Sequence, residues 1–232
     1  MKPIAKFNNH PLELATIANL MSENLEIVTI RPEFAPALAE LQRACFPTLG
    51  EQELMREEHF LKHCEIFPEG EFVALVNGRV VALGSGFFYN FDFDQPRHTF
   101  NEIIAGGYYT NHDPEGDYYY GADISVHPDY RGRRIGRKLY DARKELVIRT
   151  NRKGIVAGGV LPGYPNYRHQ LTIPEYVEKV VAGELFDPTL TMQLRNGFEV
   201  RGLLKNYIDD SNSQNWATLI VWQNPHYVAK TP

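Results

Sequence analysis

The sequence YYYGADISVHPDYRGRRIGRKL at residues 118–139 decides the fold. Its first part alternates in polarity, so we expect a strand over residues 118–126, because successive side chains of a strand point to opposite faces. Proline has no amide hydrogen to donate to a sheet, so the strand should end before Pro128. On this pattern one face carries Ala122, Ile124 and Val126, and the other carries Asp123 and Ser125.

The second part of this stretch opens a helix. Its apolar side chains recur at helical spacing and predict an amphipathic helix over residues 134–150. The apolar stripe consists of Ile135, Leu139, Ala142 and Leu146. Gly132 and Gly136 therefore lie where a strand passes into a helix.

A helix start of this kind is suited to bind phosphate. The first amides of a helix have no partner inside it, and the helix dipole adds about half a positive charge there. Glycine lets the backbone approach a ligand, and arginine adds charge-assisted hydrogen bonds. Residues 131–152 hold nine Lys or Arg and two acidic residues, although the whole chain has a net charge of −5. The pattern indicates an anionic ligand, and the alternative is a solvated helix face.

The rest of the sequence predicts one mixed α/β domain over residues 25–232, after a lead-in over residues 1–24 that hints at one short helix. Strands are expected over 25–30, 72–76, 80–88, 155–159, 198–205 and 216–223, and helices over 35–44, 51–63, 99–104, 174–182 and 187–196. Asn77-Gly78 is a strong hairpin signal between two of the strands.

Residues 126–139, VHPDYRGRRIGRKL, resemble the acetyl-CoA-binding motif of the GNAT N-acetyltransferase superfamily. That motif runs Arg or Gln, two residues, Gly, one residue, then Gly or Ala. Arg131 and Gly136 match its ends, and Arg134 replaces its first glycine, where a helical backbone would tolerate arginine. The order of the expected elements also resembles this family. The resemblance implies a GNAT-like α/β fold with a mixed, splayed central sheet flanked by helices, and acetyl-CoA as the acyl donor.

The resemblance also implies the donor site. Backbone groups of Ile124 and Val126 would bind the pantetheine arm of coenzyme A, and the amides of residues 131–137 would hold its pyrophosphate. The expected cofactor-binding residues are Ile124, Ser125, Val126, Arg131, Gly132, Arg133, Arg134, Ile135, Gly136 and Arg137.

Several segments are similar to GNAT domains that are fused to carbon–nitrogen hydrolase (nitrilase-type) domains. These segments are residues 120–164, 175–179 and 183–188. We expect no hydrolase domain in this chain, so the resemblance implies that any such partner is a separate chain.

Attack of an amine on a thioester needs a base and a group that protonates the leaving thiolate. Asp123 is the expected base, directly or through water, and the alternative is a solvated or capping carboxylate. Many family members have a tyrosine four residues before Gly197-Phe198, where this chain has Gln193. Strand alternation places Tyr119 on the Asp123 side, so Tyr119 is the candidate acid, and the alternative is a packing role.

The long connection after residue 159 is expected to shape the acceptor site, as in the family. Its candidate substrate-binding residues are Tyr164, Tyr167 and His169. A connection of this length is commonly a lid or a binding loop. It could equally form a homodimer contact.

The composition narrows the cellular setting. With 43% hydrophobic and 23% charged residues, the chain is an ordinary soluble globular one. Its acidic balance argues against nucleic-acid binding, and no apolar stretch approaches the roughly 20 residues that span a bilayer. Two cysteines form neither a disulfide framework nor a metal-ligand pattern. We expect a cytoplasmic protein without a signal peptide, a metal, a nucleic-acid partner or a membrane partner.

The predicted function is acetyl transfer from acetyl-CoA to an amine of a small molecule, by direct attack in a ternary complex. The acidic balance favours a cationic amine. The alternative is a non-catalytic acyl-CoA-sensing or partner-docking module, which Gln193 and Arg134 favour. A nucleotide-binding enzyme is disfavoured, because the chain has no Gly-Lys-Ser/Thr signature and no Gly-x-Gly-x-x-Gly turn with a downstream acidic partner.

Overall fold

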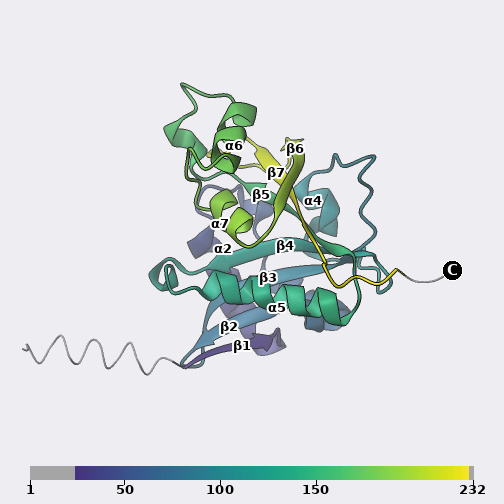
Figure 1. The fold of residues 1–232 in the computed structure, drawn as a ribbon. Helices are drawn as coiled ribbons and strands as arrows, with labels where there is room; N and C mark the ends of the chain where they lie inside the picture. The colour runs from purple at the N-terminus through teal and green to yellow at the C-terminus, as the bar shows by residue number, and fades with distance from the viewer. Residues whose placement is uncertain (1–23, 230–232) are drawn as a thin grey trace, which may run out of the picture.

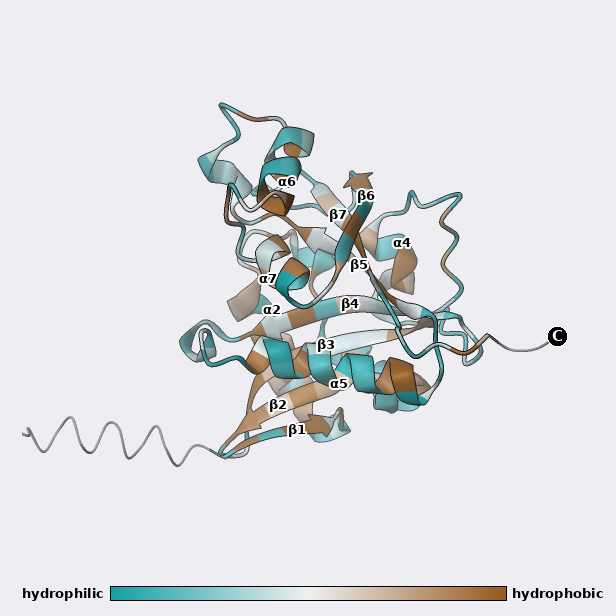
Figure 2. Ribbon diagram, viewed as in Figure 1, coloured by the Kyte–Doolittle hydropathy of each residue, from teal (hydrophilic) through white to brown (hydrophobic). Residues whose placement is uncertain are grey.

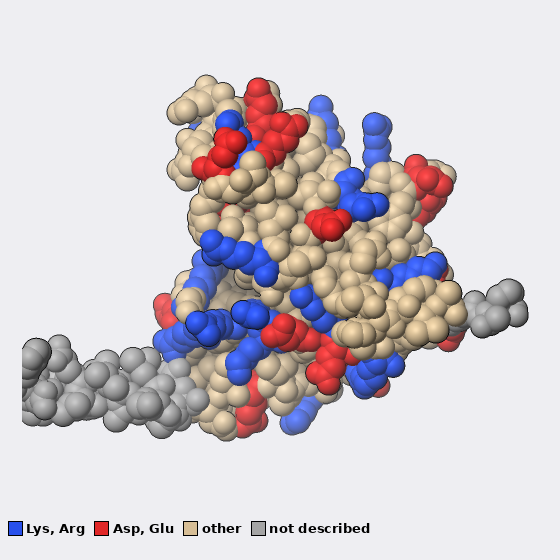
Figure 3. All heavy atoms as spheres, in the orientation of Figure 1, with Lys and Arg blue, Asp and Glu red and all other residues tan. Residues whose placement is uncertain are grey.

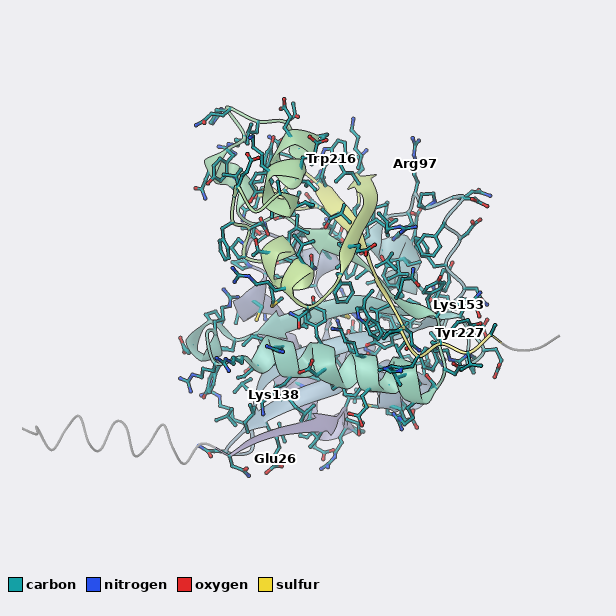
Figure 4. The ribbon with its side chains drawn as sticks, viewed as in Figure 1. Glu26, Arg97, Lys138, Lys153, Trp216 and Tyr227 are labelled. Atoms are coloured by element: carbon teal, nitrogen blue, oxygen red, sulfur yellow. The ribbon has the colours of Figure 1, made fainter. Side chains whose placement is uncertain are left out.

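The computed structural model describes residues 24–229, which form a seven-stranded sheet with helices on both faces (Figure 1). The strand order is β1-β2-β3-β4-β5-β7-β6, and β4 and β5 are the parallel pair among otherwise antiparallel neighbours. The strands are β1 (Leu25–Thr29), β2 (Phe72–Val76), β3 (Arg79–Tyr89), β4 (Tyr118–Val126), β5 (Gly154–Val160), β6 (Glu199–Lys205) and β7 (Trp216–Gln223). Glu26 in β1 and Trp216 in β7 lie toward opposite ends of this order (Figure 4).

The helices form two layers around the sheet. Helix α5 packs on one face against β2, β3 and β4, and helix α2 packs on the other face against β3 and β4. The helices are α2 (Ala35–Cys45), α3 (Glu57–Ile66), α4 (Phe100–Ile103), α5 (Ile135–Arg149), α6 (Ile173–Val181) and α7 (Leu190–Arg195). Short 3₁₀ helices lie at Pro32–Phe34, Glu51–Glu53, Pro68–Gly70, Ala105–Gly107, Pro128–Tyr130 and Tyr164–Asn166.

Two hydrophobic clusters, one on each face, hold the layers together. Leu139 of α5 and Tyr119 of β4 belong to the first cluster, and Leu38 of α2 and Tyr120 of β4 belong to the second. All four side chains are fully buried. In Figure 2 strand β2 is largely hydrophobic, and much of the outer side of α5 is hydrophilic. The amphipathic pattern read from the sequence therefore sets which side of α5 meets the sheet.

Strands β4 and β5 separate halfway along their length. They pair over Tyr118–Gly121 and Gly154–Ala157, yet β4 continues to Val126 and β5 to Val160. The two strand ends therefore diverge and leave an opening in the middle of the sheet. The splayed sheet that the family resemblance implied is confirmed.

Strand β4 also contains a bulge next to this opening. Consecutive residues of β3 pair with Asp123 and with Gly121, which leaves Ala122 as an extra residue. A bulge of this kind shifts the alternation of side chains by one position. Ala122 therefore belongs to the cluster under α2, whereas Ile124 and Val126 belong to the cluster under α5. The expectation that these three side chains share a face was wrong.

The predicted elements agree with the structure apart from one helix and several end positions. The helix expected over residues 51–63 is a 3₁₀ turn at Glu51–Glu53 followed by α3, which begins at Glu57. The GNAT-like α/β fold class is confirmed. The expected lead-in helix lies outside the described residues. Within residues 24–229, no helix has both the length and the apolar character that crossing a bilayer requires.

Candidate functional site

An outer cleft of about 830 Å³ lies between the end of β4, the start of α5, α7 and the segment after α2. Four arginines and one aspartate contribute the charged side chains of its lining, namely Arg131, Arg134, Arg137, Arg195 and Asp210. Figure 3 shows Lys and Arg side chains gathered around a hollow at the left of the view, where α5 begins. This cleft is suited to an anionic ligand.

The start of α5 presents backbone donors to this cleft. Ile135, Gly136 and Arg137 are its first three residues, and within the described chain their amides donate to no backbone carbonyl. A Cβ at Gly136 would lie 3.4 Å from Met192 Sδ, so the start of α5 lies close to α7 at this point. Exposed amides, a helix dipole and arginines together fit the diphosphate of coenzyme A.

Arg134 has a left-handed backbone conformation, with φ at 63° and ψ at 15°. Glycine is favoured in this region because it has no Cβ. The expectation that a right-handed helical backbone would tolerate arginine here was wrong, because Arg134 precedes α5 and its own backbone is left-handed. The family's usual glycine at this position therefore has a steric reason.

Nine of the ten predicted cofactor-binding residues line the outer cleft. The exception is Arg133, whose guanidinium donates to the Asp129 carbonyl oxygen and lies 4.9 Å from the ring centre of Tyr130. Arg131 lines the cleft and also donates from Nε to the Val126 carbonyl oxygen at 3.0 Å, which ties the turn to the end of β4.

An inner chamber of about 100 Å³ lies at the splay, next to the outer cleft. Its strand walls are Ala122, Asp123 and Ile124 of β4 and Gly158, Gly159 and Val160 of β5. Both spaces share five lining residues, namely Phe46, Leu49, Ile124, Val160 and Thr189. Among the described residues that line the chamber, none is Lys or Arg, whereas Glu53 and Asp123 are acidic. The site therefore joins a basic cleft to an acidic chamber.

Asp123 is the most deeply placed carboxylate of the chamber. Its Oδ2 accepts hydrogen bonds from Gln42 Nε2 at 2.7 Å and from Ser125 Oγ at 3.2 Å. Burial raises the pKa of Asp123 to about 6, although the Gln42 hydrogen bond and the charge of Arg143 act in the opposite direction. A carboxylate that titrates close to neutral pH is suited to accept and release a proton.

Arg143 of α5 lies beneath the bulge and is 2% exposed. Its guanidinium donates to the carbonyl oxygens of Ser85, at 2.7 Å, and of Asp123. Its Cζ also lies 5.6 Å from the ring centre of Tyr119. A Cβ at Gly121 would lie 3.3 Å from its Nη1, so glycine leaves room for the guanidinium. Arg143 thus fixes the peptide that directs the Asp123 side chain toward α2.

Gln193 of α7 lines the inner chamber and is 3% exposed. Its Oε1 is buried and accepts no hydrogen bond from any described residue. A Cβ at Gly159 would lie 2.7 Å from this oxygen, so Gln193 depends on glycine opposite it. The family usually has a tyrosine at this position, and in this chain the side-chain amide of Gln193 faces the splay instead.

The chamber is roofed by two connections, residues 46–56 and residues 206–215. They meet in an isolated bridge between Leu49 and Asp210, and the Gly50 amide donates to the Asp209 carbonyl oxygen at 3.2 Å. Glu53 from the first connection lines the chamber, and burial raises the pKa of its carboxyl. Tyr207 from the second connection lines it as well.

Cys45, the last residue of α2, lines the outer cleft. Burial raises the pKa of its thiol to about 11, and the charge of Asp123 acts in the same direction. The thiolate is the reactive form of cysteine, so Cys45 stays an unreactive thiol at neutral pH.

The prediction of Tyr119 as the acid was wrong. Its hydroxyl donates to the Gly70 carbonyl oxygen at 2.7 Å, and the residue lines neither the cleft nor the chamber. Alternation placed it beside Asp123, and the extra residue Ala122 moves the two side chains to different faces.

The three predicted acceptor residues also lie away from the two spaces. Tyr164 is buried and donates to the Leu171 carbonyl oxygen, Tyr167 packs against Tyr176, and His169 is exposed. The long connection folds into a compact unit around α6, because the Asp187 carboxylate accepts hydrogen bonds from the Tyr176 hydroxyl and the Gly163 amide, both at 2.9 Å. The prediction that these three residues line the acceptor site was therefore wrong.

Gln42 and Arg143 were not predicted as site residues, although each leaves a signal in the sequence. Gln42 follows Leu38 by four residues, and Arg143 follows Leu139 by four, so both stand on the apolar stripe of their helix. A polar residue at a core position is an informative exception. Glu53 falls at the start of the helix that the sequence predicted over residues 51–63, and Tyr207 lies in a connection without a periodic pattern, so only the structure places these two residues in the chamber.

Comparison with known proteins agrees with this geometry. Residues 35–157 match the family model described as the acetyltransferase (GNAT) family. The loading GNATL domain of CurA from Lyngbya majuscula has a similar fold, with a TM-score of 0.76 and 18% identity, over 88% of this chain and 99% of that one.

Two Bacillus subtilis (strain 168) proteins are similar in sequence. The probable hydrolase YhcX is 42% identical over 192 residues, and the match spans 82% of this chain but 37% of YhcX. The uncharacterized N-acetyltransferase YkwB is 33% identical over 228 residues, and the match spans 98% of this chain and 96% of YkwB.

The left-handed backbone at Arg134 predicts a stability difference between two substitutions. Arg134→Ala keeps the strained conformation, whereas Arg134→Gly relieves it. We expect the glycine variant to be more stable than the alanine variant by about 0.5–1 kcal/mol in urea unfolding. Both variants lack the guanidinium, so the comparison isolates the backbone. Equal stability of the two variants would show that residue 134 is not left-handed in solution.

The raised pKa of Asp123 predicts that Asp123→Asn stabilises the fold in a pH-dependent way. The folded pKa of about 6 exceeds the ordinary value of 3.8, so ionisation of Asp123 opposes folding. The stabilisation by asparagine should be near zero at pH 4, grow through pH 6 and level off at roughly 3 kcal/mol above pH 7. Urea unfolding from pH 4 to 8 measures it, with the exposed Asp141→Asn as control. A pH-independent difference would contradict the raised pKa.

Proposed function

The chain belongs to the acetyltransferase (GNAT) family, and from this membership we propose that it transfers an acetyl group from acetyl-CoA to the amine of a small molecule. The junction of a basic outer cleft with an acidic inner chamber at the β4–β5 splay carries this proposal. We further propose that residues 25–232 act as one domain in the cytoplasm.

The outer cleft accounts for the binding of the acyl donor. The amides of Ile135, Gly136 and Arg137 would hold the diphosphate, with Arg131 and Arg134 beside them. The part of β4 beyond residue 121 has no strand partner on the β5 side, so its backbone could bind the amide groups of the pantetheine arm. The thioester would then lie at the splay, between the cleft and the chamber.

The inner chamber would bind the acceptor amine. A cavity of about 150 Å³ can hold a benzene-sized molecule, so a chamber of about 100 Å³ suits the amine end of a small acceptor. Its acidic lining, Glu53 and Asp123, favours a cationic amine and disfavours an acceptor that carries a carboxylate next to the amine. The amine would attack the thioester directly, while Asp123 removes a proton and passes it to the leaving thiolate.

A second candidate function is a non-catalytic acyl-CoA sensor or docking module. Gln193 favours it, because an amide cannot protonate a thiolate as the family's usual tyrosine does. A separate nitrilase-type hydrolase is the partner that we propose for such a module, on the basis of the resemblance of residues 120–164, 175–179 and 183–188 to GNAT domains fused to such hydrolases. A homodimer stays a prediction.

Binding of coenzyme A tests the donor site directly. Calorimetry should detect binding by the unaltered protein, and Arg137→Ala should weaken it by roughly 10- to 100-fold through loss of a charge-assisted hydrogen bond. Lys138→Ala is the matched control, because Lys138 (Figure 4) is the next residue of α5 but does not line the cleft. Absence of binding, or equal weakening by both variants, would contradict the proposed site.

Release of free thiol from acetyl-CoA with a panel of small amines tests the chemistry. We expect kcat/KM to fall below a pH near 6, as Asp123 becomes protonated, and Asp123→Asn to lower kcat by roughly 100-fold or more. Asp141→Asn should leave both unchanged. Tight donor binding without thiol release for any amine would instead support the sensor.

A further inference from the structure

The proposed reaction leaves one proton to remove from the inner chamber. At neutral pH an alkylamine enters as an ammonium with three N–H bonds. The product amide keeps one of these protons and the coenzyme A thiol takes another, so the third must reach solvent. Asp123 is 7% exposed and carries the proton that passes from the amine to the thiolate. The third proton therefore needs a separate path to solvent.

A chain of hydrogen bonds leads away from the chamber. The Tyr207 hydroxyl lies 3.0 Å from the Tyr120 hydroxyl, which in turn lies 2.7 Å from His98 Nε2. His98 Nδ1 lies 2.8 Å from the Pro96 carbonyl oxygen. Tyr207 and Tyr120 are buried, whereas His98 is half-buried. The chain therefore runs from the chamber toward the surface.

The bond between His98 and Pro96, at the outer end of the chain, determines which group donates and which accepts in each of the other bonds. A carbonyl oxygen only accepts, so His98 Nδ1 must donate to Pro96. Burial lowers the pKa of His98, so its ring is neutral at pH 7 and its Nε2 accepts. Tyr120 must then donate to His98, and its oxygen accepts from the Tyr207 hydroxyl. The Tyr207 oxygen makes no other hydrogen bond within the described residues, so both lone pairs remain for a ligand.

The Tyr207 hydroxyl lies beside the place that the acceptor nitrogen would take in the inner chamber. Tyr207 lines the inner chamber together with Gly158, the first residue of β5 beyond its pairing with β4. A Cβ at Gly158 would lie 2.5 Å from the Tyr207 hydroxyl oxygen, so this oxygen lies directly over the β5 backbone at the splay. Only glycine at position 158 leaves room for it.

The outer end of the chain can take up a proton and lose it. His98 is faced by Glu102 of α4, whose charge favours the protonated ring, and by the rings of Phe91 and Tyr207. Because burial lowers the pKa of His98, a proton that reaches the ring is released again readily. His98 is thus suited to pass a proton on and not to store it.

We propose that Tyr207, Tyr120 and His98 form a proton relay that removes the excess proton of the acceptor amine from the chamber. Tyr207 is the catalytic member, because it touches the amine, and the other two residues act through it. The relay rests on the proposed acyltransfer and accounts for a proton that Asp123 alone does not remove.

The relay step balances without a further reactant. One N–H bond of the ammonium breaks as a bond forms to the Tyr207 oxygen. The Tyr207 proton moves to the Tyr120 oxygen, and the Tyr120 proton moves to His98 Nε2, which then releases it to water. The neutral amine attacks the acyl carbon, and its second N–H proton passes to the Asp123 carboxylate. The carbon–sulfur bond then breaks, and the thiolate receives this proton from Asp123.

Single substitutions separate the relay from simple packing. Tyr207→Phe, Tyr120→Phe and His98→Gln should each lower kcat by roughly 10- to 100-fold and change the solvent deuterium isotope effect on kcat. The double variant Tyr120→Phe/Tyr207→Phe should be no slower than either single one, because a relay acts as a unit. Tyr109→Phe is the matched control. It loses a buried hydroxyl that bonds Ser85 at 2.7 Å, and its kcat and isotope effect should not change.

The variant His98→Gln distinguishes a His98 that takes up a proton from one that only accepts the Tyr120 hydrogen bond. Glutamine can accept the Tyr120 hydrogen bond but cannot take up the proton. An unchanged kcat and isotope effect in this variant, with an active unaltered protein, would overturn the relay and leave the proposed function standing. An unaltered protein that releases no thiol with any amine would instead count against the proposed function.

A measurement without turnover tests the same chain. Nitrogen-15 NMR of the unaltered protein at pH 7.5 should show His98 protonated at Nδ1 and bare at Nε2, and Tyr120→Phe should shift the Nε2 resonance. A proton on Nε2 would reverse the direction of the chain and overturn the relay, whatever the activity.

Discussion

The separation of β4 from β5 is the constraint on which the site depends. Their parallel pairing stops at Gly121 and Ala157, and the extra residue Ala122 then turns the Asp123 side chain toward α2. Arg143 stabilises this arrangement from below, through hydrogen bonds to carbonyl oxygens on β3 and β4. A regular sheet would satisfy these backbone groups with a neighbouring strand and would close the chamber. The opening, the position of the carboxylate and the buried guanidinium therefore form one structural unit.

Charge is divided between the two spaces that meet at this opening. The outer cleft has four arginines and one aspartate in its lining, and the inner chamber has two carboxylates and, among its described lining residues, no cation. A chain with a net charge of −5 thus keeps a basic site where the donor's phosphates would bind. The acidic chamber favours an ammonium over a carboxylate. This division gives a physical reason for two ligands of opposite charge to meet at the splay.

Much of the donor site could be predicted from sequence, because it depends on local patterns. The alternation before Pro128 and the helical spacing from Ile135 place the turn between β4 and α5, and nine of ten predicted residues line the cleft. The acceptor side could not be predicted in the same way. Tyr119 was misplaced because a one-residue bulge is invisible to alternation, and Tyr207 arrives from a connection more than 80 residues later in the chain. Long-range placement of that kind follows from topology.

The proposed donor site depends on hydrogen bonds from the first amides of α5 to a diphosphate. A ¹H–¹⁵N NMR titration with coenzyme A observes those amides directly, since a hydrogen bond to phosphate shifts the amide proton strongly. We expect the largest shifts at Ile135, Gly136 and Arg137, and we expect them to follow the binding curve. Shifts that leave these three amides unchanged and concentrate elsewhere on the molecule would contradict the proposed donor site.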